Sequence, residues 1–575
     1  MHVQRLSILS LTSLLLSSAA LAAAPSDTLV LQQSSDISTL DPAQAYDIPT
    51  FSVIENLYEP LVAYQGSDLT RLHPVLATSW KISPDGKTYT FNLRKGVRFH
   101  SGNVFGCADA QYTLQRLIVT NNADSGNFFL SNSLLGTESN AADDTSITWA
   151  KIAGAVTCNA AGQLVLKLPK SDPALLSKLA SQNMSIVDRQ WAINLGEWNG
   201  TEATWKTWVG KDLTDSALSK QPSGTGAYKL VSRDDHSVLA TAFPSYWGGA
   251  PKIKNVIVQL VGEEASRLEA LKRGDADVVE VGARPVLTQL QGRSDIVILD
   301  HLANLSTPVM LMNEDIQNPA LLGSGKLDGQ GIPANFFSDV NVRQAFSYAF
   351  DDTTYIRDIT GGAGVKRTMT LPPAFLGYDK TLPTYSFDKA KATAAFKKAF
   401  GGQVWDKGFT LTITYRAGSK DGQQTIDLIA RAVESLNPKF HVITQAEQWS
   451  SLLSDSKAGK TAMLLLSWGA DYADPDNVMY TLLASDGYYS PRTHFADAQI
   501  DQWLTQARTV TDPQTRAALY RKAGARAHVL APYLLMPADP NFIVFRSNLQ
   551  GITPSSFNPM LSGLSGTYWR QLSKK

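Results

Sequence analysis

The stretch from residue 409 to residue 468 alternates between two hydrophobic patterns, and this alternation limits the possible folds more than any other feature of the chain. Apolar side chains recur first at every second position, as in a strand, and then at helical spacing. The strand-like stretches are 411–415, 442–443 and 463–467, and the helix-like stretches between them are 426–433 and 449–453. Strands joined through helices by short connections lie parallel, with right-handed crossovers, so the sequence predicts an α/β fold.

Charged residues follow two of these predicted strands. Arg416 follows the first strand, and the run Trp468, Gly469, Ala470 and Asp471 follows the third. In open parallel sheets, ligands bind beyond the carboxyl ends of the strands. We therefore expect the guanidinium and the carboxylate at the same edge of the sheet, beside a ligand site.

The N-terminus is typical of a secretory signal. Arg5 precedes an apolar, hydroxyl-rich stretch from Leu6 to Leu21, and the following alanines provide small-x-small cleavage sites. A bilayer span needs about 20 apolar residues, so this stretch is short for an anchor, although an uncleaved anchor is the alternative. No cysteine comes directly after this stretch, which gives no support for a lipid anchor. We expect residues 1–24 to be removed and the mature protein to be periplasmic.

The charge balance and the length narrow the function classes further. Lysine plus arginine and aspartate plus glutamate are equal at 52 each, and this balance argues against nucleic acid and anionic membranes as partners. A chain of 575 residues is too long for one ordinary core, so we expect two or more lobes. Cys107 and Cys158 are the only cysteines, and an oxidising compartment allows either a disulfide between them or two free buried thiols.

Several further elements can be predicted from local patterns. A Pro-Asp-Gly turn at 84–86 joins two strand-like runs, 80–82 and 88–93, into a hairpin. Alternating leucines predict a strand over 164–168, and helical spacing predicts a helix over 109–118. Asp339 can cap a helix whose apolar stripe is formed by Val342, Ala345, Phe346, Ala349 and Phe350.

A series of short motifs runs from about Leu40 to Phe545. It comprises LDPA at 40–43, ENLYEPL at 55–61, PVLA at 74–77, FNLR at 91–94, VRFHSG at 97–102, GTGAY at 224–228, YWGG at 246–249, GDADV at 274–278, VRQAF at 342–346 and WGADYADP at 468–475. In type and order these motifs resemble the bacterial family 5 extracellular solute-binding proteins, the dipeptide- and oligopeptide-binding group of ABC importers.

The resemblance implies a two-lobed periplasmic-binding-protein fold, type II-like, with an extra subdomain on the first lobe and two hinge crossings. Lobe one would be 25–305 plus 540–575, with the inserted subdomain at about 76–215, and lobe two would be 306–539. The crossings would lie near 305–311 and 538–544.

The resemblance also implies a function. The chain would be a non-enzymatic, monomeric carrier without a cofactor, which captures a short peptide and passes it to membrane permease subunits with separate ATPase chains. In peptide-binding members, the aspartate of the motif similar to 468–472 meets the α-amine of the ligand, which assigns Asp471. Trp468 would be a pocket wall with Gly469 and Ala470 beside it, and Tyr46 and Phe51 would line the first-lobe side.

The residue that binds the ligand's carboxylate stays open. Arg416 lies near the place where dipeptide binders carry a cation, and Lys457 and Lys460 lie near cations of longer-peptide binders. Leu465 occupies a place where an oligopeptide binder can carry arginine.

Other interpretations remain for these residues and for the whole chain. Asp471 could be a surface turn residue, Arg416 a solvated strand end and Trp468 a core residue. The same fold could bind an oligosaccharide, an opine or chelated nickel, or the protein could be a chaperone. Catalysis has little support, because the sequence contains no His-Glu-x-x-His pair, no Gly-x-Ser-x-Gly elbow and no complete phosphate loop.

Overall fold

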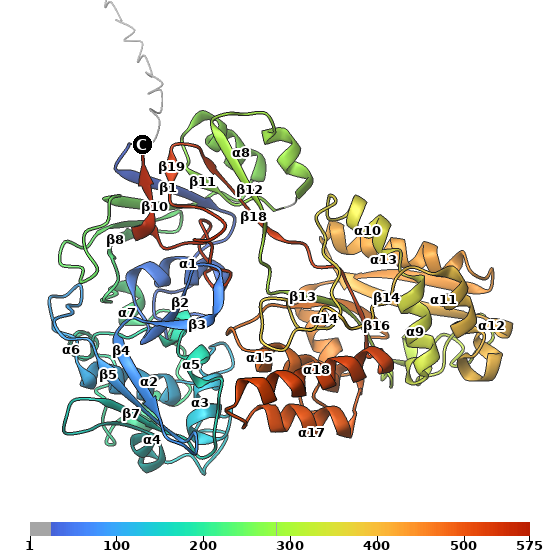
Figure 1. The fold of residues 1–575 in the computed structure, drawn as a ribbon, viewed down its shortest axis with the longest axis horizontal. Coiled ribbons are helices and arrows are strands. Elements are labelled where there is room, and N and C mark those ends of the chain that lie inside the picture. The colour runs from blue at the N-terminus through green and yellow to red at the C-terminus, as the bar shows by residue number, and fades with distance from the viewer. Residues whose placement is uncertain (1–24, 283) are drawn as a thin grey trace, which may run out of the picture.

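The computed structural model describes residues 25–282 and 284–575, so the predicted signal peptide lies outside the described residues. Two large sheets form the centres of two lobes that lie side by side (Figure 1). The first sheet has the order β12 (Ile296–Leu302), β18 (Asn541–Arg546), β11 (Val278–Val279), β1 (Thr28–Gln33), β10 (Asn255–Leu260), β9 (Ser237–Ala242) and β8 (Tyr228–Arg233). The second has the order β15 (Phe440–Glu447), β14 (Phe409–Arg416), β16 (Met463–Trp468), β13 (Thr307–Met312) and β17 (Tyr533–Leu535).

Alternation along β1 explains how the first sheet is covered on both faces. Leu29 and Leu31 pack into a core that includes α1 (Ile48–Leu57), whereas Val30 packs with α8 (Glu264–Arg273) on the opposite face. Successive side chains of a strand point to opposite faces, so one strand serves two cores. A hairpin of β2 (Val62–Gln65) and β3 (Asp68–Pro74) follows α1, and β19 (Leu549–Gln550) pairs with β20 (Ser573–Lys574) near the C-terminus.

A separate four-stranded sheet lies within residues 76–215, the range expected for an inserted subdomain. Its order is β4 (Ala77–Ile82), β5 (Thr88–Leu93), β7 (Leu164–Lys167) and β6 (Val156–Cys158). The same range contains the helices α2 (Cys107–Val119), α3 (Phe128–Leu135), α4 (Trp149–Ala155), α5 (Leu175–Lys178) and α6 (Arg189–Asn194), and α7 (Ala217–Lys220) follows directly after it. The predicted hairpin, strand and helix of this region are confirmed. Cys107 and Cys158, for which the sequence left two possibilities open, form a disulfide between the start of α2 and β6.

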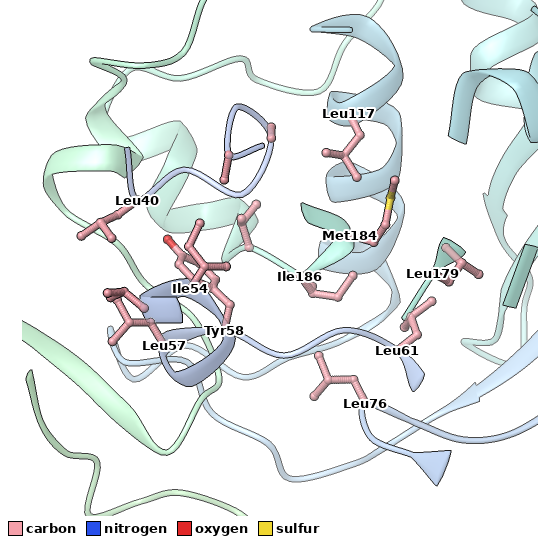
Figure 2. Close-up of a cluster of buried hydrophobic side chains, with 14 of the residues drawn as sticks. Leu40, Ile54, Leu57, Tyr58, Leu61, Leu76, Leu117, Leu179, Met184 and Ile186 are labelled. Carbon is pink, nitrogen blue, oxygen red and sulfur yellow. The ribbon is translucent and has the colours of Figure 1, made fainter. Parts of the chain in front are cut away.

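The subdomain and the first lobe share one hydrophobic core. Figure 2 shows Ile54 and Leu57 of α1, and Tyr58 directly after it, in one cluster with Leu117 of α2 and Met184 of the subdomain. All of these side chains are at most 1% exposed. Burying a large apolar side chain stabilises a fold by about 1.5–3 kcal/mol, so this shared core fixes the subdomain to its lobe.

The second sheet has the topology that the 409–468 pattern predicts. β14 pairs in parallel with both β15 and β16, through α13 (Lys420–Glu434) and α14 (Trp449–Lys457). One face is covered by α9 (Val340–Ala349), α11 (Lys389–Phe396) and α13, and the other by α14, α15 (Pro475–Leu483), α17 (Ala498–Ala507) and α18 (Pro513–Leu530). The shorter helices of this lobe are α10 (Asp352–Asp358), α12 (Gln403–Lys407) and α16 (Ser490–Thr493). The predicted cap is confirmed, since Asp339 accepts a hydrogen bond from the Asn341 amide at the start of α9.

Two chain crossings connect the sheets, from β12 to β13 and from β17 to β18 (Figure 1). They are joined side by side, because Asn304 Nδ2 donates to the Asp539 carbonyl at 2.7 Å and Asn541 Nδ2 donates to the Ala303 carbonyl at 2.9 Å. Every strand of the first sheet lies within 25–305 or 540–575, and every strand of the second lies within 306–539. The exact lobe boundaries stay a prediction.

The strand directions bring the functional edges of both sheets toward these crossings. In the first sheet, β1, β10, β11 and β12 run in one direction, because β11 and β12 are both antiparallel to β18. In the second sheet, Thr307 at the start of β13 pairs with Trp468 at the end of β16. The carboxyl ends of the parallel strands therefore lie at the crossing side of each lobe, where α/β sheets bind ligands.

Across residues 25–282 and 284–575, no helix is both long and apolar enough to cross a membrane.

Candidate functional site at the junction of the lobes

Asp471 receives hydrogen bonds from both lobes. Tyr46 Oη, from the first lobe, donates to Asp471 Oδ1 at 3.0 Å, and Asn477 Nδ2, from the second, donates to Oδ2 at 3.1 Å. Ser181 Oγ of the inserted subdomain also donates to the Asp471 main-chain carbonyl at 3.2 Å. The structure thus brings together two predicted site residues, Asp471 and Tyr46, where the lobes meet.

The local fold of 469–477 explains why Asp471 is held in this position. The chain leaves β16 at Trp468 and enters α15 at Pro475, whose preceding residue, Asp474, caps the helix by accepting from the Asp476 amide at 2.9 Å. Asn477 lies in the first turn of α15, and its Oδ1 accepts hydrogen bonds from the Asp471 amide and from Trp468 Nε1, each at 3.0 Å. One amide side chain therefore orients both the carboxylate and the indole.

The carboxylate of Asp471 is a partly buried anion with neutral partners. Among residues 25–282 and 284–575, no lysine, arginine or histidine nitrogen lies within 4.0 Å of it. Burial raises the pKa of Asp471 to about 6, although the hydrogen bonds from Asn477 and Tyr46 oppose this rise. Burial and the nearby carboxylate raise the pKa of Tyr46, so its hydroxyl remains a neutral donor. A cationic ligand would supply the counter-charge that the described part of the chain does not place there.

Aromatic rings cluster around two residues near this carboxylate, Trp468 and Tyr46. On the second lobe, the Trp468 ring lies 5.4 Å from the Tyr488 ring and 6.0 Å from the Tyr489 ring, between centroids. On the first lobe, Tyr46 makes edge-on contacts with Phe128 and Phe129, each at 6.2 Å. Aromatic faces attract cations and pack against apolar groups, so the surroundings suit an ammonium attached to an apolar side chain.

Arg416 shares the sheet edge with Asp471 but is not brought into contact with it. Arg416 ends β14 and is exposed, and its guanidinium lies 5.3 Å from the centre of the Trp449 ring. The expectation that topology places the cation and the anion at one edge is confirmed. A role of Arg416 in binding the ligand's carboxylate stays a prediction.

Lys457 and Lys460 lie before β16, at the end of that strand opposite to Asp471, and a role of either lysine at the ligand's carboxylate stays a prediction. α14 returns from the carboxyl end of β15 to the amino end of β16, and both lysines lie at that return. Lys460 is also exposed and faces Asp455 at 3.8 Å. The crossover geometry places them one strand length from Asp471.

The remaining predicted site residues differ in how exposed they are. Gly469 is exposed and Ala470 is half-buried, directly before Asp471. Phe51 is half-buried on α1 and packs against the first-lobe core, and no described contact connects it with Asp471. Tyr46 is 37% exposed, which leaves part of its side chain open to a ligand.

Sequence reasoning missed Asn477, Ser181 and Tyr488. The Asp-Pro pair at 474–475 carried a signal for a helix start that places Asn477 in the first turn, although not for its contacts, because aspartate is a common N-cap and proline a common first helical residue. Ser181 and Tyr488 carried none, since each becomes relevant only through contacts between distant segments. The described residues contain no group of three or more histidine, cysteine, aspartate or glutamate side chains arranged to hold a metal ion.

The sequence matches a known protein family over most of its length. The family model described as bacterial extracellular solute-binding proteins, family 5, matches residues 71–490. The dipeptide-binding protein of Escherichia coli is 25% identical over 516 residues, which cover 86% of each chain. Heme-binding protein A of Haemophilus influenzae is 24% identical over 524 residues, which cover 88% of this chain and 85% of that protein.

Solved structures show the same architecture. The ABC transporter-associated periplasmic binding protein DppA of Helicobacter pylori, in complex with the peptide STSA, superposes with a TM-score of 0.71 at 24% identity. The match covers 95% of this chain and 98% of that one. The fold is therefore the mixed α/β fold of periplasmic binding proteins, as the motif series implied.

Proposed function

The chain belongs to the bacterial extracellular solute-binding proteins of family 5, and from this premise we propose that it binds short peptides between its lobes and delivers them to an ABC importer. Membership of this family makes it a solute-binding protein and not an enzyme. Its functional site is therefore a binding site, and the proposal concerns the solute that this site takes.

The peptide proposal rests on the surroundings of the Asp471 carboxylate. This carboxylate lies at the lobe junction, and within the described part of the chain its side-chain hydrogen bonds come from Tyr46 and Asn477, both of them neutral. A desolvated carboxylate binds an ammonium through a short, charge-assisted hydrogen bond. The free α-amine of a peptide supplies such an ammonium, and the rings of Trp468 and Tyr488 offer an apolar surface for the adjoining side chain.

Two of the similar proteins are named for different solutes. The relative from Escherichia coli is named for dipeptides and that from Haemophilus influenzae for heme. Heme presents propionate groups, which the negative charge of Asp471 would repel. The chemistry of the junction therefore favours the peptide.

Capture requires the lobes to move about the two crossings. A ligand that contacts both lobes binds the closed form more tightly than the open form, and this difference in affinity drives closure. Tyr46 and Asp471 come from opposite lobes, so an ammonium at Asp471 would be enclosed by both. The closed protein would then dock on permease subunits whose ATPases are separate chains.

A periplasmic location follows from the same proposal. The predicted signal sequence over 1–24 would direct export, and the disulfide between Cys107 and Cys158 suits an oxidising compartment. The similar protein from Helicobacter pylori is itself named as periplasmic.

The proposal is tested by identifying the solute. Mass spectrometry of the natively purified protein should release short peptides with free amino termini. Calorimetry with a dipeptide and its N-acetylated form should show binding only of the free amine, because acetylation removes the ammonium. Release of an oligosaccharide, an opine, heme or a nickel chelate, or equal affinity for both peptide forms, would contradict the peptide proposal.

A further inference from the structure

A cavity in the second lobe lies away from Asp471. Its volume is about 70 Å³, and it lies among α9, α18, β17 and the segment 366–370. This volume exceeds the about 10–15 Å³ that a single water needs, so the cavity has room for a small molecule.

The wall of this cavity carries a buried arginine whose charge is not neutralised. Arg367 is 6% exposed, and no carboxylate among residues 25–282 and 284–575 lies within 4.0 Å of its nitrogens. Nη1 donates to the Ser306 carbonyl at 2.7 Å, and Nη2 donates to the Asn304 carbonyl at 2.9 Å. Nε has no hydrogen-bond partner in the described part of the chain.

Burial without a counter-ion disfavours the charged guanidinium. It lowers the pKa of Arg367 to about 10, and an anion in the cavity would relieve this penalty. Arginine suits carboxylates in particular, because its planar fork matches their geometry.

Lys366 and His528 also line the cavity, but neither offers an unpaired positive charge to an anion. Lys366 is already paired with Asp352, and its Nζ also donates to Ser386 Oγ at 2.9 Å. Burial lowers the pKa of His528, so the imidazole is neutral near pH 7. The rest of the wall combines apolar side chains, such as Phe350, Met369, Ala527 and Leu534, with hydroxyl-bearing side chains such as Ser347 and Thr384.

We propose that this cavity is a second binding site, specific for a small aliphatic carboxylate. The carboxylate group lies against Arg367, and a short alkyl chain lies against the apolar wall. The site is separate from the junction at Asp471 and does not depend on which solute that junction binds.

The requirement for a negative charge on the ligand can be tested without changing the protein. Thermal shift and saturation-transfer NMR on the wild-type protein would compare acetate, propionate, butyrate and octanoate with propionamide, at matched ionic strength in sodium chloride. We expect propionate and butyrate to raise Tm saturably, and octanoate and propionamide to leave Tm unchanged. No shift with any carboxylate, or an equal shift with propionamide, would overturn the proposal.

The location can be tested without altering Arg367, which also braces the crossing. Ala527→Leu adds atoms to the cavity wall, and Ala525→Leu adds the same atoms elsewhere on α18. We expect propionate binding to be lost in the first variant and kept in the second and in Asp471→Asn. Binding that persists in Ala527→Leu, or disappears in Asp471→Asn, would overturn the assignment. If Ala527→Leu does not fold, the comparison of carboxylates with propionamide on the wild-type protein still tests the proposal.

Discussion

Tyr46 Oη donates a 3.0 Å hydrogen bond to Asp471 Oδ1, and this bond joins residues 425 positions apart on opposite lobes. This hydroxyl donates to the carboxylate from the first lobe, while Asn477 donates to it from the second. Because an incoming ammonium would share this carboxylate, the pair connects ligand binding with the relative position of the lobes.

Removing this hydroxyl should weaken peptide binding moderately. Tyr46→Phe deletes one neutral donor and leaves the negative charge of Asp471 in place. A hydrogen bond of this kind contributes about 0.5–1.5 kcal/mol, so we expect a loss of affinity of about 2- to 12-fold by calorimetry. A loss as large as that caused by Asp471→Asn would mean that Tyr46, and not the charge, dominates the site.

Peptide affinity should depend on pH with a maximum between about 6 and 8. Burial raises the pKa of Asp471 to about 6, so below this pH the ligand-free carboxyl is protonated and an ammonium must displace that proton. Affinity then falls by up to about tenfold per pH unit. Above about pH 8 it falls again, because the peptide's own α-amine loses its proton.

Calorimetry in buffers of different ionisation enthalpy would measure this proton exchange. In Asp471→Asn the acidic limb should disappear while the alkaline limb remains. A wild-type affinity that is flat between pH 5 and pH 7 would show that Asp471 does not titrate in the site.

Asp471 and Asp474, three positions apart, should respond in opposite ways to the same substitution. Asp474 is buried and paired with Arg516 at 2.8 Å, so its carboxylate serves the fold. Breaking a buried pair costs about 3–5 kcal/mol, so Asp474→Asn should lower the free energy of unfolding by about that amount. Asp471→Asn should leave it nearly unchanged, because the substitution removes a carboxylate without an ionic partner.

Urea unfolding followed by circular dichroism would measure both variants. Asp427→Asn is the matched control, since this half-buried carboxylate on α13 has no hydrogen bond or ion pair within the described ranges. Equal destabilisation by Asp471→Asn and Asp474→Asn would show that both aspartates are structural.

The disulfide should contribute to stability but not to binding. Cys107 and Cys158 close a loop with a sequence separation of 51, and both lie in the inserted subdomain. Loop closure of this length stabilises by roughly 2–4 kcal/mol, so the double replacement by serine should lower Tm while peptide affinity stays the same. A reductant should lower the Tm of the wild type and not that of the double variant. A marked loss of affinity would mean that the subdomain positions the site.

The sequence allowed most of the second lobe to be predicted and little of the contact between lobes. β14, β15 and β16 follow from alternation at positions such as Leu411 and Ile413, because strand and helix periods differ and each buries one face. Parallel topology then placed Arg416 and Asp471 at one edge without any knowledge of their side-chain contacts.

The rest depended on long-range packing. Nothing within the window around Asn477 reveals that its amide holds both Asp471 and Trp468, and nothing near Ser181 reveals its bond to the Asp471 carbonyl. The position of Lys457 and Lys460 likewise becomes clear only from the topology. Their separation from Asp471 is short along the chain, but α14 carries them to the other end of the strand.

The most direct measurement is a calorimetric comparison of wild type and Asp471→Asn with a dipeptide and its N-acetylated form. Removing one charge of a desolvated pair costs about 2–5 kcal/mol, so we expect the free dipeptide to bind about 30- to 4,000-fold more weakly to the variant. The N-acetylated form should bind both proteins equally weakly. Unchanged affinity of Asp471→Asn for the free dipeptide would contradict the account.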